Sequence, residues 1–148
     1  KQAGMAVNLD IHYADDWCDP NQQPTPDSWK NLSIEILKDS VYNYTFQVLK
    51  YLQSKKLTPE MIQVGNENNF GMLWPVGKID TSKSLAEQNK QWNNFGTLLN
   101  SGIKAVRDFS KNSSIGAILN LPVHHLCPCD GINFQPKIAS NKLSTQLF

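Results

Sequence analysis

A carboxylic acid and an amide stand side by side directly after a short apolar segment. The run Val64-Gly65-Asn66-Glu67-Asn68-Asn69 follows the apolar residues that begin at Met61. A glutamic acid in such a place can protonate the oxygen of a glycosidic bond. The asparagine before it can donate a hydrogen bond to a sugar hydroxyl. The pair is also common in ordinary loops, where Asn66 would favour a turn, so it does not decide the function by itself.

A second polar segment follows the preceding apolar stretch. Between Asp10 and Pro20 the chain reads DIHYADDWCDP, and the residues with useful chemistry there are Asp10, His12, Asp15 and Trp17. Aromatic faces stack on sugar rings, and carboxylates accept hydrogen bonds from sugar hydroxyls. Each residue also has an ordinary interpretation, with Trp17 as a core anchor and His12 as a satisfied buried histidine. Two such segments after two successive strands favour a carbohydrate site.

The elements that would position these segments alternate between strands and helices. Apolar runs predict strands over about 5–11, 61–64 and 115–121, the second of them buried on both faces. Ser33 is an N-cap residue for a helix that ends near Lys55-Lys56, with an apolar face formed by Leu37, Val41, Tyr44, Val48 and Leu52. Ser84-Leu85-Ala86-Glu87 fits a capping box for a second helix, whose expected buried stripe is Trp92, Phe95, Leu99, Gly102 or Ile103, and Val106.

This alternation predicts an α/β fold with a parallel sheet. The loops after the strands are long and the connections into the strands are short, which suits a (β/α)₈ TIM barrel. A doubly wound sheet would give the same order of elements. No G-x-G-x-x-G sequence follows a strand, which makes a dinucleotide-binding fold less favoured.

Composition limits the class of protein. The 148 residues fit one domain, and with 40% hydrophobic and 18% charged residues a globular chain is expected. A net charge of +1 argues against nucleic acid or an anionic membrane as partner, and no apolar run reaches the roughly 20 residues of a membrane span. Three cysteines form no disulfide framework. The start at Lys1, without initiator Met or signal peptide, is interpreted as a truncation.

Several motifs in fixed order are similar to glycoside hydrolase family 53, the endo-β-1,4-galactanases. The resemblance covers about residues 1–121 without large gaps. It is carried by the segments LDIHYADDWCDP (9–20), WKNL (29–32), VYNYT (41–45), QVGNE (63–67), NFGMLWPVGK (69–78) and LLNSGIKAVRD (98–108).

The resemblance implies a partial (β/α)₈ TIM barrel comprising about its third to fifth βα units. It implies retaining hydrolysis of β-1,4-galactan, a polysaccharide of pectic arabinogalactan, with Glu67 as acid/base and Asn66 contacting the sugar. By the same match, the substrate cleft would be lined by Asp10, His12, Asp15, Trp17 and Trp74. No metal or organic cofactor is implied. A secreted or periplasmic protein, monomeric at full length, is expected.

Two departures from the family qualify this expectation. The family's nucleophile is a second Glu after the seventh strand, and no acid here matches its motif. Residues 122–148 form a divergent tail that no longer follows the family, so the catalytic-domain fragment is expected to end at 121, and Asn120 stands near where a His is expected. A frameshifted 3′ end would explain both features. The tail residues His124, His125, Cys127 and Cys129 are zinc-type ligands, but their spacing matches no usual zinc finger.

Two alternatives stay open. One is that the chain is a non-catalytic or non-functional fragment, since three of eight strands leave open sheet edges. The other is that it is part of another clan A glycosidase, such as a mannanase or xylanase. The segments around His12-Tyr13 and 72–75 favour the galactanase.

Overall fold

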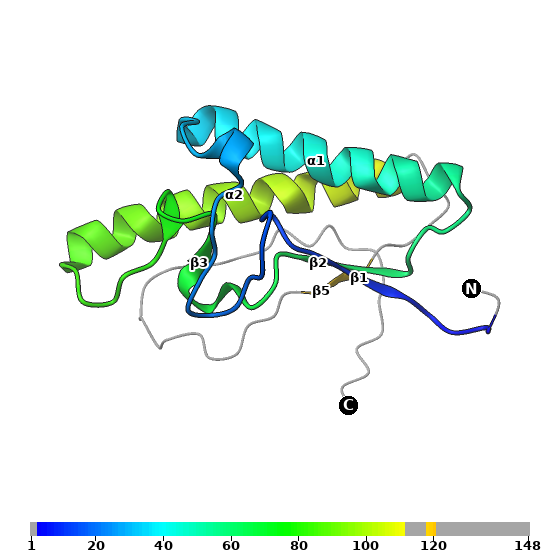
Figure 1. Ribbon diagram of the computed structural model, residues 1–148, viewed down its shortest axis with the longest axis horizontal. Helices are drawn as coiled ribbons and strands as arrows, with labels where there is room; N and C mark the ends of the chain where they lie inside the picture. The colour runs from blue at the N-terminus through cyan, green and yellow to red at the C-terminus, as the bar shows by residue number, and fades with distance from the viewer. Residues whose placement is uncertain (1–2, 112–117, 121–148) are drawn as a thin grey trace.

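Two long helices lie side by side over a three-stranded parallel sheet (Figure 1). The computed structural model describes residues 3–111 and 118–120. Chain order is β1 (Asn8–Ile11), α1 (Ile34–Ser54), β2 (Met61–Val64), α2 (Leu85–Lys111) and β5 (Ile118–Asn120). The strands are adjacent in the order β1-β2-β5, so each crossover moves one strand along. Both helices lie on one face of the sheet, as in a barrel segment, whereas a doubly wound sheet carries helices on both faces.

The sheet presents different chemistry on its two faces. Leu9 pairs with Ile62 and Ile11 with Val64. Ile62 and Val64 are fully buried beneath the helices, while the alternate residues Met61 and Gln63 are only half-buried. The expectation that this strand is buried on both faces was therefore wrong, because the residues of its second face are only partly buried.

Helix α1 begins where the sequence predicts and buries Leu37 and Val41 as expected, but further along it buries Thr45 and Leu49 in place of the predicted residues. The Ser33 side chain accepts a hydrogen bond from the Ile36 amide, which caps the first turn. The buried residues are Leu37, Val41, Thr45 and Leu49, whereas the predicted Tyr44 is 44% exposed and Val48 and Leu52 are only partly buried. Thr45 can be buried because its hydroxyl donates to the Val41 carbonyl at 2.7 Å and contacts the Tyr13 hydroxyl at 2.7 Å.

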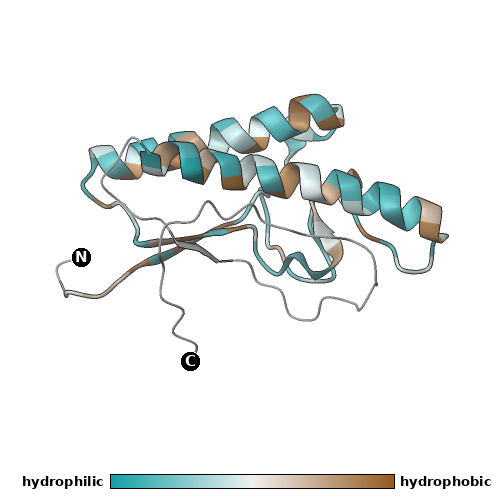
Figure 2. Cartoon of the chain, turned by 180° about the vertical axis from the view of Figure 1, so that it is seen from behind, coloured by the Kyte–Doolittle hydropathy of each residue, from teal (hydrophilic) through white to brown (hydrophobic). Residues whose placement is uncertain are grey.

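Helix α2 confirms the predicted capping box and most of the predicted stripe. The Ser84 amide donates to the Glu87 carboxylate, and the Glu87 amide donates to the Ser84 hydroxyl. Its buried residues are Phe95, Leu98, Leu99, Gly102, Ile103, Ala105, Val106 and Phe109, and Trp92 packs partly buried against them. Hydrophobic and hydrophilic residues alternate along both helices, as Figure 2 shows. Neither helix offers, within the described part of the chain, an apolar stretch suited to crossing a bilayer.

The loop after β2 contains a small hairpin that the sequence did not predict. Strands β3 (Gly71–Met72) and β4 (Gly77–Lys78) pair antiparallel, after a 3-10 turn at Asn68–Phe70. Gly71 has φ 89°, and a Cβ there would lie 1.8 Å from the Gly77 carbonyl oxygen, so only glycine fits.

The boundaries of the outer strands differ from the sequence prediction or are only partly tested. β1 is shorter than predicted, although the Val7 carbonyl already accepts the Met61 amide at 3.1 Å. Residues 115–117, the tail 122–148 and the possible zinc ligands lie outside the described residues.

Candidate active site

Strand β2 ends in a strained turn that carries Glu67 at the surface. Gly65 has φ 81°, and Glu67 itself adopts the left-handed conformation with φ 46° and ψ 48°. For a residue with a Cβ this conformation costs roughly 1–2 kcal/mol. Beneath the turn, the buried Asn68 side chain donates to the Val64 carbonyl at 3.0 Å. Such strain is characteristic of functional sites, where the surroundings hold it in place.

Asp10 and His12 lie beside this turn at the end of β1. Asp10 pairs in register with Gln63, and its carboxylate lies 3.7 Å from Nε2 of His12. Burial raises the pKa of the Asp10 carboxyl, while His12 and a hydrogen bond from Gln63 lower it and the charge of Glu67 raises it further. The influence of Glu67 means that the two carboxyl groups share one region of the surface.

Two tryptophans and a phenylalanine lie in the loops after β1 and β2. Trp17 is 68% exposed, so it is no core anchor, and its ring centroid lies 6.2 Å from that of His12. Trp74 donates from Nε1 to the Phe70 carbonyl at 3.0 Å, and the Lys78 ammonium lies 4.4 Å from the centroid of the Trp74 ring. Phe70 is 43% exposed and was not among the predicted site residues.

The remaining two predicted residues have different surroundings. Asn66 donates from Nδ2 to the Cys18 carbonyl at 3.0 Å, which ties the turn after β2 to the loop after β1. The Asp15 carboxylate accepts a hydrogen bond from the Asp27 amide at 2.9 Å. It also lies close enough to the Lys30 ammonium for their opposite charges to attract. The structure therefore brings Asp10, His12, Trp17 and Glu67 into one region and gives Asp15 a loop-stabilising contact instead.

A set of hydrogen bonds joins the loop after β1 to the loop after β2, and the sequence did not predict it. We call it the two-loop junction and define it by Gln23, Thr25, Asn66, Glu67 and Trp74. Gln23 donates from Nε2 to the Asn66 carbonyl at 2.7 Å and accepts the Trp74 amide on its backbone oxygen at 2.7 Å. Thr25 donates to the Trp74 carbonyl at 2.7 Å.

No pattern in the sequence marks this junction. Gln22 and Gln23 are adjacent and identical in type, yet Gln22 is exposed and Gln23 is only 4% exposed. Nothing in residue spacing distinguishes the two within an irregular loop.

The arrangement suits acid–base chemistry on a polar ligand. Glu67 carries an exposed carboxyl group, Asp10 and His12 provide polar groups at the end of the neighbouring strand, and Trp17 offers a flat apolar face. Among the described residues, no three His, Cys, Asp or Glu side chains come together as metal ligands.

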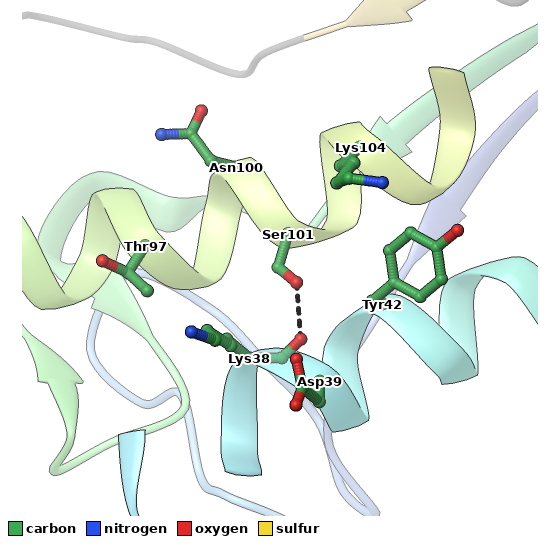
Figure 3. Close-up of a pocket in the computed structure, with 7 residues that line it drawn as sticks. All are labelled: Lys38, Asp39, Tyr42, Thr97, Asn100, Ser101 and Lys104. Atoms are coloured by element: carbon green, nitrogen blue, oxygen red, sulfur yellow. Dashed lines mark hydrogen bonds between the residues drawn. The ribbon is translucent and has the colours of Figure 1, made fainter. Parts of the chain in front are cut away.

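A pocket between the helices is a weaker candidate. Its volume is about 440 Å³, and its lining residues are Lys38, Asp39, Tyr42, Thr97, Asn100, Ser101 and Lys104 (Figure 3). The Ser101 hydroxyl donates to the Lys38 carbonyl inside it, and the ammonium groups of Lys38 and Lys104 already pair with Glu35 and Asp108. No residue from the loops after β1 and β2 lines this pocket, so it is separate from Glu67.

Comparisons with known proteins bear on this geometry. The sequence profile "Glycosyl hydrolase family 53" matches residues 1–125. An arabinogalactan endo-beta-1,4-galactanase of Cellvibrio japonicus is 39% identical over 114 residues, which are 76% of this chain and 29% of that protein. A probable arabinogalactan endo-beta-1,4-galactanase A of Aspergillus flavus is 38% identical over 105 residues, 71% of this chain and 27% of that protein.

Solved structures give the same picture. The GH53 catalytic domain of Ignisphaera aggregans superimposes with a TM-score of 0.65 at 39% identity, covering 81% of this chain and 30% of that one. One of two fungal beta-1,4-galactanases superimposes with a TM-score of 0.66 at 32% identity, covering 81% of this chain and 33% of that one. The chain therefore spans about a third or less of the length of these relatives.

Proposed function

Because the chain belongs to glycosyl hydrolase family 53, we propose that Glu67 is the acid/base carboxylate of a retaining endo-β-1,4-galactanase. The substrate would be the β-1,4-galactan of pectic arabinogalactan. The observation that carries this proposal is the placement of Glu67. It stands on a strained turn at the carboxyl end of a parallel strand, close enough to Asp10 for its charge to help raise the pKa of that carboxyl. In barrel enzymes, catalytic groups occupy this end of the strands.

The proposed chemistry proceeds in two steps. Glu67 first gives its proton to the glycosidic oxygen of the leaving sugar while a second carboxylate attacks the anomeric carbon. Ionised Glu67 then removes a proton from a water molecule, which hydrolyses the glycosyl–enzyme bond and regenerates both carboxyl groups. The second carboxylate must lie about 5–5.5 Å from the first, and we assign it to no described residue. This chemistry requires no metal or organic cofactor.

The other predicted residues would hold the galactan chain. Trp17 and Trp74 provide ring faces for stacking on sugars, while Asn66, Asp10 and His12 provide hydrogen bonds to hydroxyl groups. Asp15 retains this role only if its side chain leaves the Asp27 amide. A polymeric substrate of plant cell walls also implies a secreted or periplasmic enzyme. We place β1, β2 and β5 as the third to fifth strands of the barrel.

A chimeric enzyme tests the acid/base role. Residues 3–111 replace the matched segment of the Cellvibrio japonicus galactanase, and hydrolysis of linear β-1,4-galactan is measured by reducing-end release. Glu67→Gln should lower kcat by about 10²–10⁴-fold, the usual contribution of a general acid–base. Glu35→Gln, the same change at an exposed helix position, should leave kcat unchanged.

Three outcomes would overturn the proposal. The first is a Glu67→Gln chimera that keeps full activity. The second is a chimera that hydrolyses β-mannan or xylan in preference to galactan, which would assign the chain to a different substrate. The third is turnover of galactan by the 148-residue chain alone, because the second carboxylate would then have to lie within it.

A further inference from the structure

We propose that Gln23 is a positioning residue for the acid/base, and that its side-chain amide holds the backbone of Glu67 in its left-handed conformation. The inference rests on the proposed catalytic role of Glu67. Gln23 lies 44 residues before Glu67 in the chain, in the loop after β1. Gln23 is not among the site residues expected from the sequence.

The side-chain nitrogen of Gln23 reaches both peptide groups that flank Glu67. Nε2 lies 2.7 Å from the Asn66 carbonyl oxygen and 3.5 Å from the Glu67 carbonyl oxygen. The Asn66 carbonyl belongs to the peptide plane before the Glu67 Cα, and the Glu67 carbonyl belongs to the plane after it. The dihedral angles φ and ψ of Glu67 describe how these two planes are rotated about Cα. The amide has two N–H groups, and its shorter bonds go to the Asn66 and Asp19 carbonyls, so the 3.5 Å contact with the Glu67 carbonyl is the weakest of the three. Gln23 therefore fixes mainly the peptide plane before the Glu67 Cα, which limits φ.

The conformation that Gln23 limits is one that Glu67 would not adopt on its own. A left-handed backbone is unfavourable for a residue with a Cβ, so free chains relax from it to extended or right-handed conformations. Such relaxation would rotate the peptide planes and move the carboxyl group away from the position that the turn gives it. Displacement of a catalytic group by about 1 Å can lower a rate by about 100-fold.

Gln23 can act in this way because its own position is fixed. The side chain is buried, and Nε2 also donates to the Asp19 carbonyl at 3.1 Å. Its backbone oxygen accepts the Trp74 amide at 2.7 Å. A buried donor that lost these acceptors would stay unsatisfied, so the amide has no alternative position of similar energy. The hydrogen bond from the Asn66 side chain to the Cys18 carbonyl joins the same two loops.

The test compares three single-substitution variants of the chimeric galactanase. Gln23→Met keeps the length and volume of the side chain but removes the donor. Gln22→Met makes the same change at the exposed neighbour, whose side chain has no part in the junction. Glu67→Gln provides the reference for loss of the acid. Each enzyme is assayed on β-1,4-galactan and on an aryl β-galactobioside whose leaving group departs without protonation.

On galactan, Gln23→Met should lower kcat by about 10–100-fold, while KM changes by less than about 3-fold and Gln22→Met matches the parent. On the aryl substrate, bond cleavage does not need the acid, so single-turnover release of the aryl group should fall by less than about 3-fold. A residue that merely supports the fold would lower both activities together.

Several results would overturn the inference. Gln23→Met could have the same activity on galactan as Gln22→Met. It could also lose activity on both substrates by the same factor while its free energy of unfolding equals that of the parent. Either result excludes a positioning role. If Gln23→Met does not fold, Gln23→Glu replaces it, since a protonated Glu can donate one hydrogen bond and an ionised one cannot. Its activity relative to the parent should then rise as pH falls, and a flat ratio excludes the role. If Glu67→Gln itself keeps full galactan activity, the proposed function fails instead.

Discussion

Replacing Gly102 with alanine tests how closely α2 approaches the sheet. A Cβ at this position would lie 2.5 Å from Cγ1 of Val64, 3.0 Å from the Tyr13 hydroxyl and 3.5 Å from Cγ1 of Val41. Carbon atoms in contact normally lie about 3.5–4.0 Å apart, so helix and strand must separate by about 1 Å. Val64 is fully buried in the strand next to α1 and α2, which leaves it little room to move.

The sign of the effect follows from two opposing contributions. Alanine is favoured over glycine inside a helix by roughly 0.5–1 kcal/mol. Overpacking a well-filled core costs typically about 1–3 kcal/mol. Gly102→Ala should therefore lower the free energy of unfolding by about 0–2.5 kcal/mol, with a middle value of about 1 kcal/mol.

Gly96 in the same helix provides the matched control. A Cβ there would have no neighbour within 4 Å, so only the helix contribution applies. Gly96→Ala should raise the free energy of unfolding by about 0.5–1 kcal/mol. The difference between the two variants then measures overpacking free of helix propensity.

Urea denaturation of the 148-residue chain, followed by tryptophan fluorescence and far-UV circular dichroism, measures both variants. A double variant with Val64→Ala should recover part of the loss, because the contacted methyl group is gone, with a coupling energy of about 0.5–3 kcal/mol. If Gly102→Ala stabilises the chain as much as Gly96→Ala does, the helix does not lie against β2 at this distance.

Three further substitutions have defined effects, each measured by urea denaturation. Tyr13→Phe removes the buried 2.7 Å contact with the Thr45 hydroxyl and should cost about 1 kcal/mol; no change would mean that the two hydroxyls do not interact. The hydrogen bond from Lys104 holds the pKa of Asp108 below its ordinary value of 3.8, so its stabilisation is present above that value and is lost as pH falls through the folded pKa. Asp108→Asn should therefore weaken the loss of stability in acid, and an unchanged pH profile would contradict this. Burial raises the pKa of Asp10 above 3.8, so its ionised form opposes folding at neutral pH, and Asp10→Asn should raise the urea midpoint at pH 7 but not at pH 3.

The order of elements could be predicted from the sequence because local signals fix it. Ser33 and the Ser84–Glu87 capping box mark where the helices begin, and the apolar residues of 61–64 mark the central strand. These signals depend on neighbouring residues alone. Tertiary packing decides what these signals do not, including which residues of α1 are buried, since Thr45 finds hydrogen-bond partners that a hydrophobic pattern does not reveal.

The candidate site was only partly predictable. The position of Glu67 after β2 follows from the strand, but its left-handed conformation and the contacts of Gln23 depend on two loops that are distant in the chain. Irregular loops have no periodicity, so burial of one Gln rather than its neighbour leaves no pattern. The hairpin 71–78 was missed for a similar reason, because its strands have only two residues each.

The two-loop junction has a consequence for how such enzymes can exchange parts. The loop after β1 is bonded through Gln23 and Thr25 to residues 66–74. A βα unit is the natural block of sequence to transplant between relatives, but a cut between these two loops would separate partners that fit each other. A single crossover inside α1 takes the two loops from different parents, so such recombined enzymes should be less stable than those whose crossovers lie outside both loops. The inherited unit at this part of the barrel is then a pair of loops, and a single βα repeat is too small to carry it.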